Sequence, residues 1–170
     1  MEKKYTRQFL FDKFFHVLLY TTSVLPNIYR GYLLKLRSER VGKGIRVDKD
    51  CLFYHTDKLI IGDNVWIGRR VFLSARGSLT IGNDTFLAFD SVVLTEHHVN
   101  GKGVLIRKSG FKTAPVSIGS NVLIGAKAII MPGVTIGDNV VIGANSVVTK
   151  NIPSRSIAVG VPARVIKRLK

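Results

Sequence analysis

Cysteine is almost absent from this chain of 170 residues, in which Cys51 is the only one. An intrachain disulfide is therefore excluded, and we interpret Cys51 as a buried core residue rather than a nucleophile. Long hydrophobic runs are also missing, because the least polar stretch, Phe14 to Leu25, is shorter than the ~20 residues of a transmembrane helix. No signal-peptide cleavage site follows that stretch, so the sequence predicts a cytoplasmic protein of one globular domain.

Two common nucleotide-binding motifs are missing as well. The chain has no G-x-x-x-x-G-K-[S/T] phosphate-binding loop, and no glycine-rich dinucleotide fingerprint follows a strand and helix pattern. Chemistry that depends on ATP or NAD is therefore not expected.

Acidic residues are scarce, with 11 Asp and Glu against 26 Lys and Arg, which gives a net charge of +15 and indicates an anionic partner. Part of this excess lies in residues 1–40, where two helical stretches are expected, Thr6 to Thr22 and Pro26 to Arg37. We predict that this segment is a helical cap over an open end of the fold. The alternative, which is compatible with a cap, is a basic, aromatic-rich helix in peripheral contact with the inner face of the cytoplasmic membrane.

What the sequence does contain is a large aliphatic residue at every sixth position through most of its length. A hexapeptide period predicts a parallel β-helix, in which three hexapeptides form one triangular coil, as from Ile118 to Ile136. The predicted inward positions are Ile61, Ile67, Leu73, Ile81, Leu87, Val93, Ile118, Ile124, Ile130, Ile136, Ile142 and Val148.

A second inward position follows each aliphatic residue by four and holds small or branched residues. These are Val65, Val71, Gly77, Thr85, Ser91, Val122, Ala128, Val134, Val140 and Ser146. A weaker first coil begins near Val41 and places Cys51 at such a position. Between Leu73 and Ile81 the frame slips by two residues, which we interpret as a bulge at a corner of the prism.

The period is interrupted between Val93 and Ile118, where residues 95–115 form an insertion rich in glycine, lysine and arginine. A long excursion from a regular scaffold is a common place for function. His97 and His98, two of the four histidines, stand at the root of this insertion and are the candidate catalytic residues.

The C-terminal third carries the segments Met131-Pro-Gly-Val-Thr-Ile-Gly-Asp, Ile142-Gly-Ala-Asn-Ser-Val-Val-Thr-Lys and Ala158-Val-Gly-Val-Pro-Ala-Arg. With the repeats before them, these segments resemble the hexapeptide-repeat acyltransferases over residues 41–170. The resemblance implies an all-β fold, a left-handed parallel β-helix with a short N-terminal helical segment, an extended loop from the coil stack and a short C-terminal helix. It divides the chain into a cap (1–40) and an acyltransferase domain (41–170) with an inserted loop (95–115) and a C-terminal tail (154–170).

The resemblance also implies a catalytic base five residues beyond the last aliphatic residue before the loop, which is His98 counted from Val93. His97 is the alternative, although it would point inward if the strand continued. A neutral imidazole can accept the proton of a sugar hydroxyl as that hydroxyl attacks a thioester. Glu96 or Asp90 would orient the imidazole, and the backbone N–H of Ala126 would stabilise the oxyanion.

By the same resemblance, acetyl-CoA is the acyl donor, and the expected contacts are Gly125, Ala126, Ala144, Thr149, Lys150, Arg164 and Lys167. Many relatives have Trp where this chain has Leu123, so a stacking contact with CoA is lost. The family also implies a homotrimer with active sites between subunits. The short basic N-terminus is similar to that of O-acetyltransferases of bacterial surface polysaccharides, so the expected acceptor is a sugar hydroxyl of an exopolysaccharide, capsule or O-antigen precursor.

Three alternatives remain at this point. In the first, the acceptor is a small molecule outside polysaccharide synthesis. In the second, the chain is a basic scaffold without catalysis that binds a membrane surface or nucleic acid, although no nucleic-acid motif supports the latter partner. A γ-type carbonic anhydrase shares the fold but needs three metal-binding histidines, and His16, His55, His97 and His98 have no such spacing. We therefore expect no metal.

Overall fold

The computed structural model describes residues 27–99, 103 and 105–170. The first expected helical stretch, Thr6 to Thr22, lies outside these residues. The second is present as helix α2, Asn27–Leu34. No helix in the described ranges is long and apolar enough to cross a membrane.

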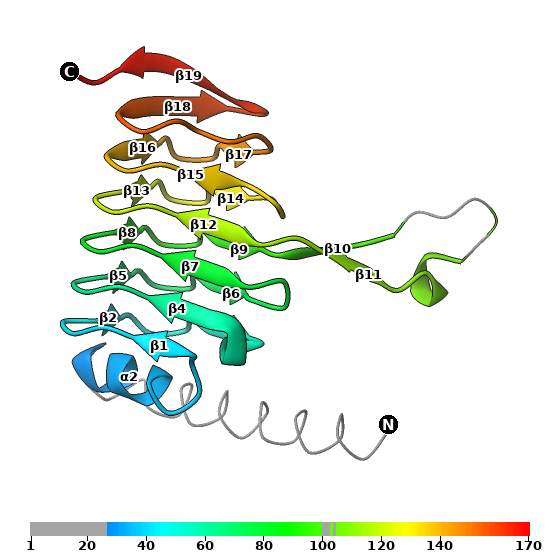
Figure 1. Ribbon diagram of the computed structural model, residues 1–170, viewed down its shortest axis with the longest axis horizontal. Helices are drawn as coiled ribbons and strands as arrows, with labels where there is room; N and C mark the ends of the chain where they lie inside the picture. Colours follow the sequence, from blue (N-terminus) through cyan, green and yellow to red (C-terminus); the bar gives the residue numbers. More distant parts are fainter. Residues whose placement is uncertain (1–26, 100–102, 104) are drawn as a thin grey trace.

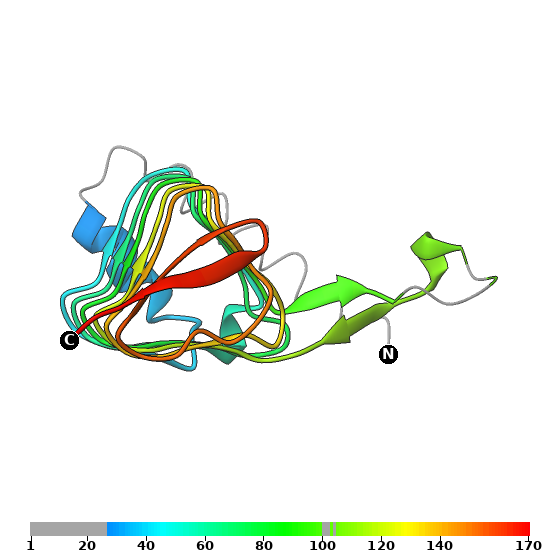
Figure 2. The same cartoon turned by 90° about the horizontal axis from the view of Figure 1, so that it is seen from above.

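The described chain winds into a left-handed parallel β-helix whose coils stack as a triangular prism (Figures 1 and 2). Three sheets, parallel except where β19 joins face B, form its sides, here called faces A, B and C. Face A contains β1 (Arg40–Val41), β4 (Leu59–Ile61), β7 (Leu79–Ile81), β12 (Val116–Ile118) and β15 (Thr135–Ile136). Face B contains β2 (Arg46–Val47), β5 (Trp66–Ile67), β8 (Phe86–Leu87), β13 (Leu123–Ile124), β16 (Val140–Ile142), β18 (Ser156–Gly160) and β19 (Ala163–Arg168). Face C contains β3 (Leu52–Tyr54), β6 (Phe72–Ser74), β9 (Val92–Leu94), β14 (Ile129–Ile130) and β17 (Val147–Val148).

The hydrophobic core is a continuous column along the axis of the prism. All twelve aliphatic residues predicted to point inward are buried, from Ile61 to Val148, and none is more than 1% exposed. Cys51 is buried as well, and its thiol donates to the carbonyl oxygens of Asp48 and Gly68 at 3.2 and 3.1 Å. Burial raises the pKa of this thiol to about 12, as expected for a core cysteine.

The slip in the sequence frame reflects coils of two lengths. Leu59 pairs with Leu79 twenty residues later, whereas Ser117 pairs with Thr135 eighteen residues later. The longer coils hold their additional residues at the corner between faces C and A, in the 3-10 helix Thr56–Lys58 and in a turn closed by a 2.9 Å bond from Ser78 N–H to the carbonyl of Ala75.

This turn corrects one predicted core residue. The inward position belongs to Ala75, which is 1% exposed, and not to Gly77, which is only partly buried. Because the two additional residues shift the frame, a fixed count of four from Leu73 misses the buried position.

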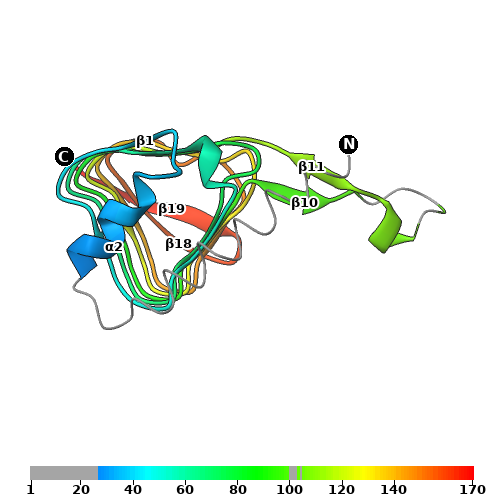
Figure 3. The same cartoon turned by 90° about the horizontal axis from the view of Figure 1, so that it is seen from below.

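Helix α2 covers the open end of the first coil (Figure 3). Leu34, the last residue of the helix, is fully buried, and the Nε of Arg30 donates to the carbonyl of Val47 at 2.7 Å. Gly31 faces the backbone carbonyl of Ile45 so closely that a Cβ would collide with it. The absence of a side chain at this position therefore allows the helix to approach the coil.

The predicted C-terminal helix is wrong. Residues 163–168 form strand β19, which pairs antiparallel with β18 and turns back over the end of face B. Without β19, one edge of β18 would be unpaired at the last coil, and pairing with the returning chain satisfies its backbone groups. The tertiary environment of this edge, which the sequence does not display, thus decides the conformation of the tail.

Candidate active site

The insertion is an arm that leaves the prism at the corner between faces C and A and projects away from it (Figures 1 and 2). Its base is an antiparallel ribbon of β10 (Glu96–His98) and β11 (Phe111–Thr113), followed outward by the 3-10 helix Ile106–Lys108. The register pairs Glu96 with Thr113, His97 with Lys112 and His98 with Phe111. The expected loop therefore has a regular ribbon at its root.

The root of the arm is fixed by Thr95, whose side chain is fully buried. Its hydroxyl donates to the carbonyl of Ser74 and accepts from the N–H of Gly77, both at 2.8 Å. The N–H of Ala114 donates to the carbonyl of Thr95 at 2.9 Å. A Cβ at Gly77 would lie 2.6 Å from that carbonyl oxygen, so glycine permits the close approach of this corner to the arm.

Glu96 faces the same root. The hydroxyl of Ser74 donates to its Oε1 at 2.7 Å, and the hydroxyl of Thr95 lies 3.2 Å from its Oε2. Within the described ranges, no hydrogen bond joins Glu96 to His97 or His98. The contacts of Glu96 are therefore those of a residue that holds the arm.

The two histidines lie on opposite faces of the ribbon, because side chains alternate along a strand. His98 shares a face with Glu96, and its ring lies 4.3 Å from the ring of Phe111. The guanidinium of Arg76 lies over the same phenyl ring at 4.7 Å. Both histidines are exposed, since the chain has already left the prism where His97 would have pointed inward.

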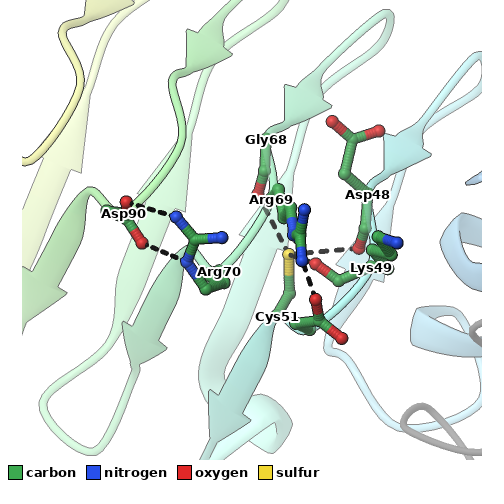
Figure 4. A network of polar contacts seen from close by, with 8 residues as sticks. Asp48, Lys49, Cys51, Gly68, Arg69, Arg70 and Asp90 are labelled. Atoms are coloured by element: carbon green, nitrogen blue, oxygen red, sulfur yellow. Dashed lines mark hydrogen bonds and ion pairs between the residues drawn. The ribbon is translucent and has the colours of Figure 1, made fainter.

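Asp90, the other residue considered for orienting the imidazole, is engaged elsewhere (Figure 4). Its two carboxylate oxygens accept from Nε and Nη2 of Arg70 at 2.6 and 2.7 Å. This ion pair lowers the pKa of Asp90, mainly through its hydrogen bonds with Arg70. It lies at the corner between faces B and C, whereas the arm leaves from the corner between C and A.

Four of the residues expected to bind CoA gather at the corner between faces B and C. Gly125 and Ala126 lie one coil below Ala144. Arg164 pairs with Val159, and Val159 packs over Gly143 from the next coil up. Gly125 is confined by the next coil, because a Cβ there would lie 2.6 Å from the carbonyl oxygen of Ile142. Small residues at this corner leave its outer surface open to a ligand.

Backbone donors are free at this corner. Within the part of the chain that the structure describes, the N–H groups of Ala126 and Ala144 donate no hydrogen bond. The N–H of Gly125 and that of Asn145 are used between coils, with acceptors Ile142 and Ala126 at 2.8 and 2.9 Å. The corner therefore offers one outward amide donor in each of two successive coils.

The remaining expected CoA contacts lie apart from this corner. Thr149 and Lys150 are exposed on the same corner as the arm, above it in the stack, and Lys167 is exposed on β19. In a single chain, His98 and Ala126 thus stand on two different corners of the prism. The structure groups the two histidines on the arm and four of the seven expected CoA residues at another corner, but it does not bring these two groups together.

An open groove of about 600 Å³ lies elsewhere, on face B beside its corner with face A. Leu123, Phe86 and Val141 line it together with Arg155 and the C-terminal Lys170. None of the residues expected to bind CoA or to catalyse lines this groove. Among residues 27–99, 103 and 105–170, no three His, Cys, Asp or Glu side chains are grouped to hold a metal ion.

Sequence reasoning missed three residues of the arm root, Ser74, Arg76 and Phe111. The available signal was the two-residue slip between Leu73 and Ile81, which marks the corner that carries Arg76. Phe111 gave a weaker signal as an aromatic residue in an otherwise basic and glycine-rich insertion.

Comparison with known proteins places this architecture in a family. Residues 115–150 match the family described as "Hexapeptide repeat of succinyl-transferase". The galactoside O-acetyltransferase of Escherichia coli K12 is 38% identical over 128 residues, which are 64% of this chain and 63% of that protein. The chain thus spans less than two thirds of this relative. The putative colanic acid biosynthesis acetyltransferase WcaF of Escherichia coli K12 is 31% identical over 139 residues, 82% of this chain and 74% of that protein.

A solved structure of a galactoside acetyltransferase in complex with coenzyme A superimposes with a TM-score of 0.87 at 31% identity, over 97% of this chain and 82% of that one. Coenzyme A in that complex supports the expected acyl donor, acetyl-CoA. The fold, the repeat and these similarities agree, and the chain belongs to the hexapeptide-repeat acetyltransferases.

Proposed function

We propose that this protein transfers the acetyl group of acetyl-CoA to a sugar hydroxyl of a surface-polysaccharide precursor, with His98 as the general base. The observation that carries the proposal is the exposed His98 at the root of the arm, on a fold with free amide donors at a neighbouring corner. The name of WcaF, a putative colanic acid biosynthesis acetyltransferase, supports a polysaccharide acceptor. Acetyl-CoA and activated sugars are both cytoplasmic metabolites, so the reaction is placed in the cytoplasm, with the basic N-terminal segment in peripheral contact with the membrane.

The base is needed because a sugar hydroxyl is too weakly acidic to attack a thioester unaided at neutral pH. The imidazole of His98, in its neutral form, takes the hydroxyl proton as the oxygen bonds to the thioester carbon. When the tetrahedral intermediate collapses, the C–S bond breaks and the CoA thiolate receives that proton. No acyl-enzyme forms, and the nucleophile remains the sugar.

The developing oxyanion requires a donor that is already in place. The N–H of Ala126 has no acceptor among the described residues, so it can donate to the oxyanion without breaking a bond of the fold. Gly125 and Ala144 leave room for the pantetheine arm, while Arg164 and Lys167 face the CoA phosphates, and Thr149 and Lys150 contact CoA from the other corner.

These assignments require two copies of the chain at each active site. His98 and Lys150 lie on the corner between faces C and A, whereas Ala126 and Arg164 lie on the corner between B and C. A homotrimer with rotational symmetry places one kind of corner against the other at each interface. The arm, which projects away from its own prism, then contributes His98 to the neighbouring subunit.

Calorimetry with acetyl-CoA and an assay of transfer to sugar acceptors test this function on wild type, His98→Ala and His97→Ala. All three proteins are expected to bind acetyl-CoA, and only His98→Ala loses transfer, by roughly 100-fold or more, as expected for loss of a general base. His97→Ala is the matched control on the opposite face of the ribbon. A folded wild type that does not bind acetyl-CoA would refute the function, and equal losses in both variants would refute the assignment of the base.

Subunit mixing tests the shared site. His98→Ala chains and chains carrying both Arg164→Glu and Lys167→Glu are each expected to be inactive alone. After the two are unfolded and refolded together at equal amounts, random trimers should recover roughly a quarter of wild-type transfer, because one site in four pairs two intact corners. If each site is built within one chain, the mixture stays inactive.

A further inference from the structure

We propose that Arg76 binds an anionic group of the acceptor, a carboxylate or a phosphate, beside the reacting hydroxyl. This inference rests on the proposed function, because it names the chemistry of the acceptor at the same site. It assigns a binding role to a residue that lies outside the repeat frame, at the corner that the two additional residues of the coil create.

Arg76 is held in place without having its hydrogen-bonding capacity used. Its Nε is buried and has no hydrogen-bond partner. The nearest carboxylate oxygen, Oε1 of Glu96, lies 3.8 Å away, which is too long for a hydrogen bond, and it already accepts from Ser74 at 2.7 Å. In the ranges that the structure describes, none of the five N–H donors of Arg76 makes a hydrogen bond.

Such an arrangement is unusual for a partly buried arginine, because a buried donor without an acceptor is costly. Arg70, at another corner, shows the ordinary case, with two of its nitrogens paired to Asp90 at 2.6 and 2.7 Å. The guanidinium of Arg76 is instead fixed by stacking on Phe111, with 38% of its side chain exposed. A fixed, partly exposed fork of donors is the geometry that recognises a carboxylate or phosphate with two parallel hydrogen bonds.

The guanidinium is also close to the proposed base. Phe111 lies 4.7 Å from the guanidinium carbon of Arg76 and 4.3 Å from the ring centre of His98. The imidazole and the guanidinium are therefore separated by no more than the sum of these distances, a span within reach of an acceptor of one or two sugar units. An acceptor can thus present its hydroxyl to His98 while its anionic group contacts Arg76.

The local charge favours an anion over a cation at this place. Glu96 is the single acid of the arm, and both its oxygens already face the hydroxyls of Ser74 and Thr95. Lys58 lies on the coil below, with its Nζ 3.4 Å from the carbonyl of Arg76. An incoming anion therefore meets positive charge that no internal acid fully neutralises.

The test compares matched sugars in the CoA-loaded protein by calorimetry, with glucose as the neutral probe and glucuronate and glucose 1-phosphate as the anionic ones. Wild type is expected to prefer one anionic probe over glucose, and Arg76→Gln to weaken that probe by roughly 10- to 100-fold while leaving glucose unchanged, as for loss of a charge-assisted bidentate contact. Arg76→Lys should keep part of the preference, and Arg70→Gln is the matched control that keeps all of it. The preferred probe distinguishes a carboxylate from a phosphate.

A second measurement covers the case in which these sugars have the wrong shape for the site. The Arg76 Nε–H resonance, identified by its absence in Arg76→Gln, should shift on titration with inorganic phosphate or acetate. No shift with either anion, no preference among the sugars, or equal losses for neutral and charged probes in Arg76→Gln would each overturn the proposal. Failure of the proposed function would appear differently, as absent acetyl transfer to every sugar while the anion preference persists.

Discussion

Replacing Thr95 with valine tests whether the root of the arm is built as described. The substitution keeps the shape of the side chain and removes one hydroxyl, which donates to the carbonyl of Ser74 and accepts from the N–H of Gly77 at 2.8 Å each. Because Thr95 is fully buried, valine leaves a backbone acceptor and a backbone donor without partners. Each such group costs about 1–3 kcal/mol, so the free energy of unfolding should fall by about 2–6 kcal/mol.

Urea unfolding followed by circular dichroism measures this change. Protein concentration must be held constant, because the stability of an oligomer depends on it. Thr95→Ser is the matched control, since it keeps the hydroxyl and loses one methyl group, which should cost about 1 kcal/mol. The reasoning is wrong if valine and serine at this position give the same free energy of unfolding.

Three further predictions concern other parts of the fold. Gly125→Ala should lower the free energy of unfolding by about 1–3 kcal/mol, because the new Cβ meets the backbone of the next coil. The control Ser117→Ala, on the exposed surface of face A, should change it little. Equal urea midpoints for the two variants would contradict this prediction. Cys51 should resist alkylation at pH 8 in the folded protein. Since its pKa is raised from 9.0 to about 12, the stability that it contributes should be complete below pH 9 and decline as the pH rises toward 12, which denaturation at several pH values would show; fast labelling of folded protein would argue against a buried thiol. Asp90→Asn should leave the rate of acetyl transfer unchanged, because Arg70 already holds both carboxylate oxygens of Asp90. A reduced kcat with normal stability would restore Asp90 as a partner of the base.

The core could be predicted from the sequence because the constraint that creates it is local and repeated. Every coil must place an aliphatic side chain on its axis, so a residue such as Ile124 carries its structural role in its spacing from Ile118 and Ile130. The prediction was wrong at Gly77, where a longer coil broke the spacing. It was also wrong for the tail, because the exposed edge of β18 is a tertiary feature that no local pattern displays.

The candidate site, like the fold, could be predicted from the sequence only in part. The count from Val93 favours His98 over His97, whereas the structure exposes both, on opposite faces of the ribbon, and does not distinguish between them. The partners of His98 could not be predicted, because the register of β10 with β11 decides that Phe111, and not Lys112, lies opposite it. Its catalytic role and the CoA contacts stay predictions that the proposed experiments test.

The irregularity that obscures the repeat is also what builds the site. The shorter coils turn from face C to face A with two residues fewer. Two additional residues form the turn of Arg76 and Gly77, and these two residues make opposite contributions. Gly77 allows the arm to approach, through its contact with Thr95, and Arg76 extends a guanidinium toward Phe111 on the ribbon. A departure from the frame is therefore a better guide to function in this fold than agreement with it, since regular hexapeptides specify only the column on which the site stands.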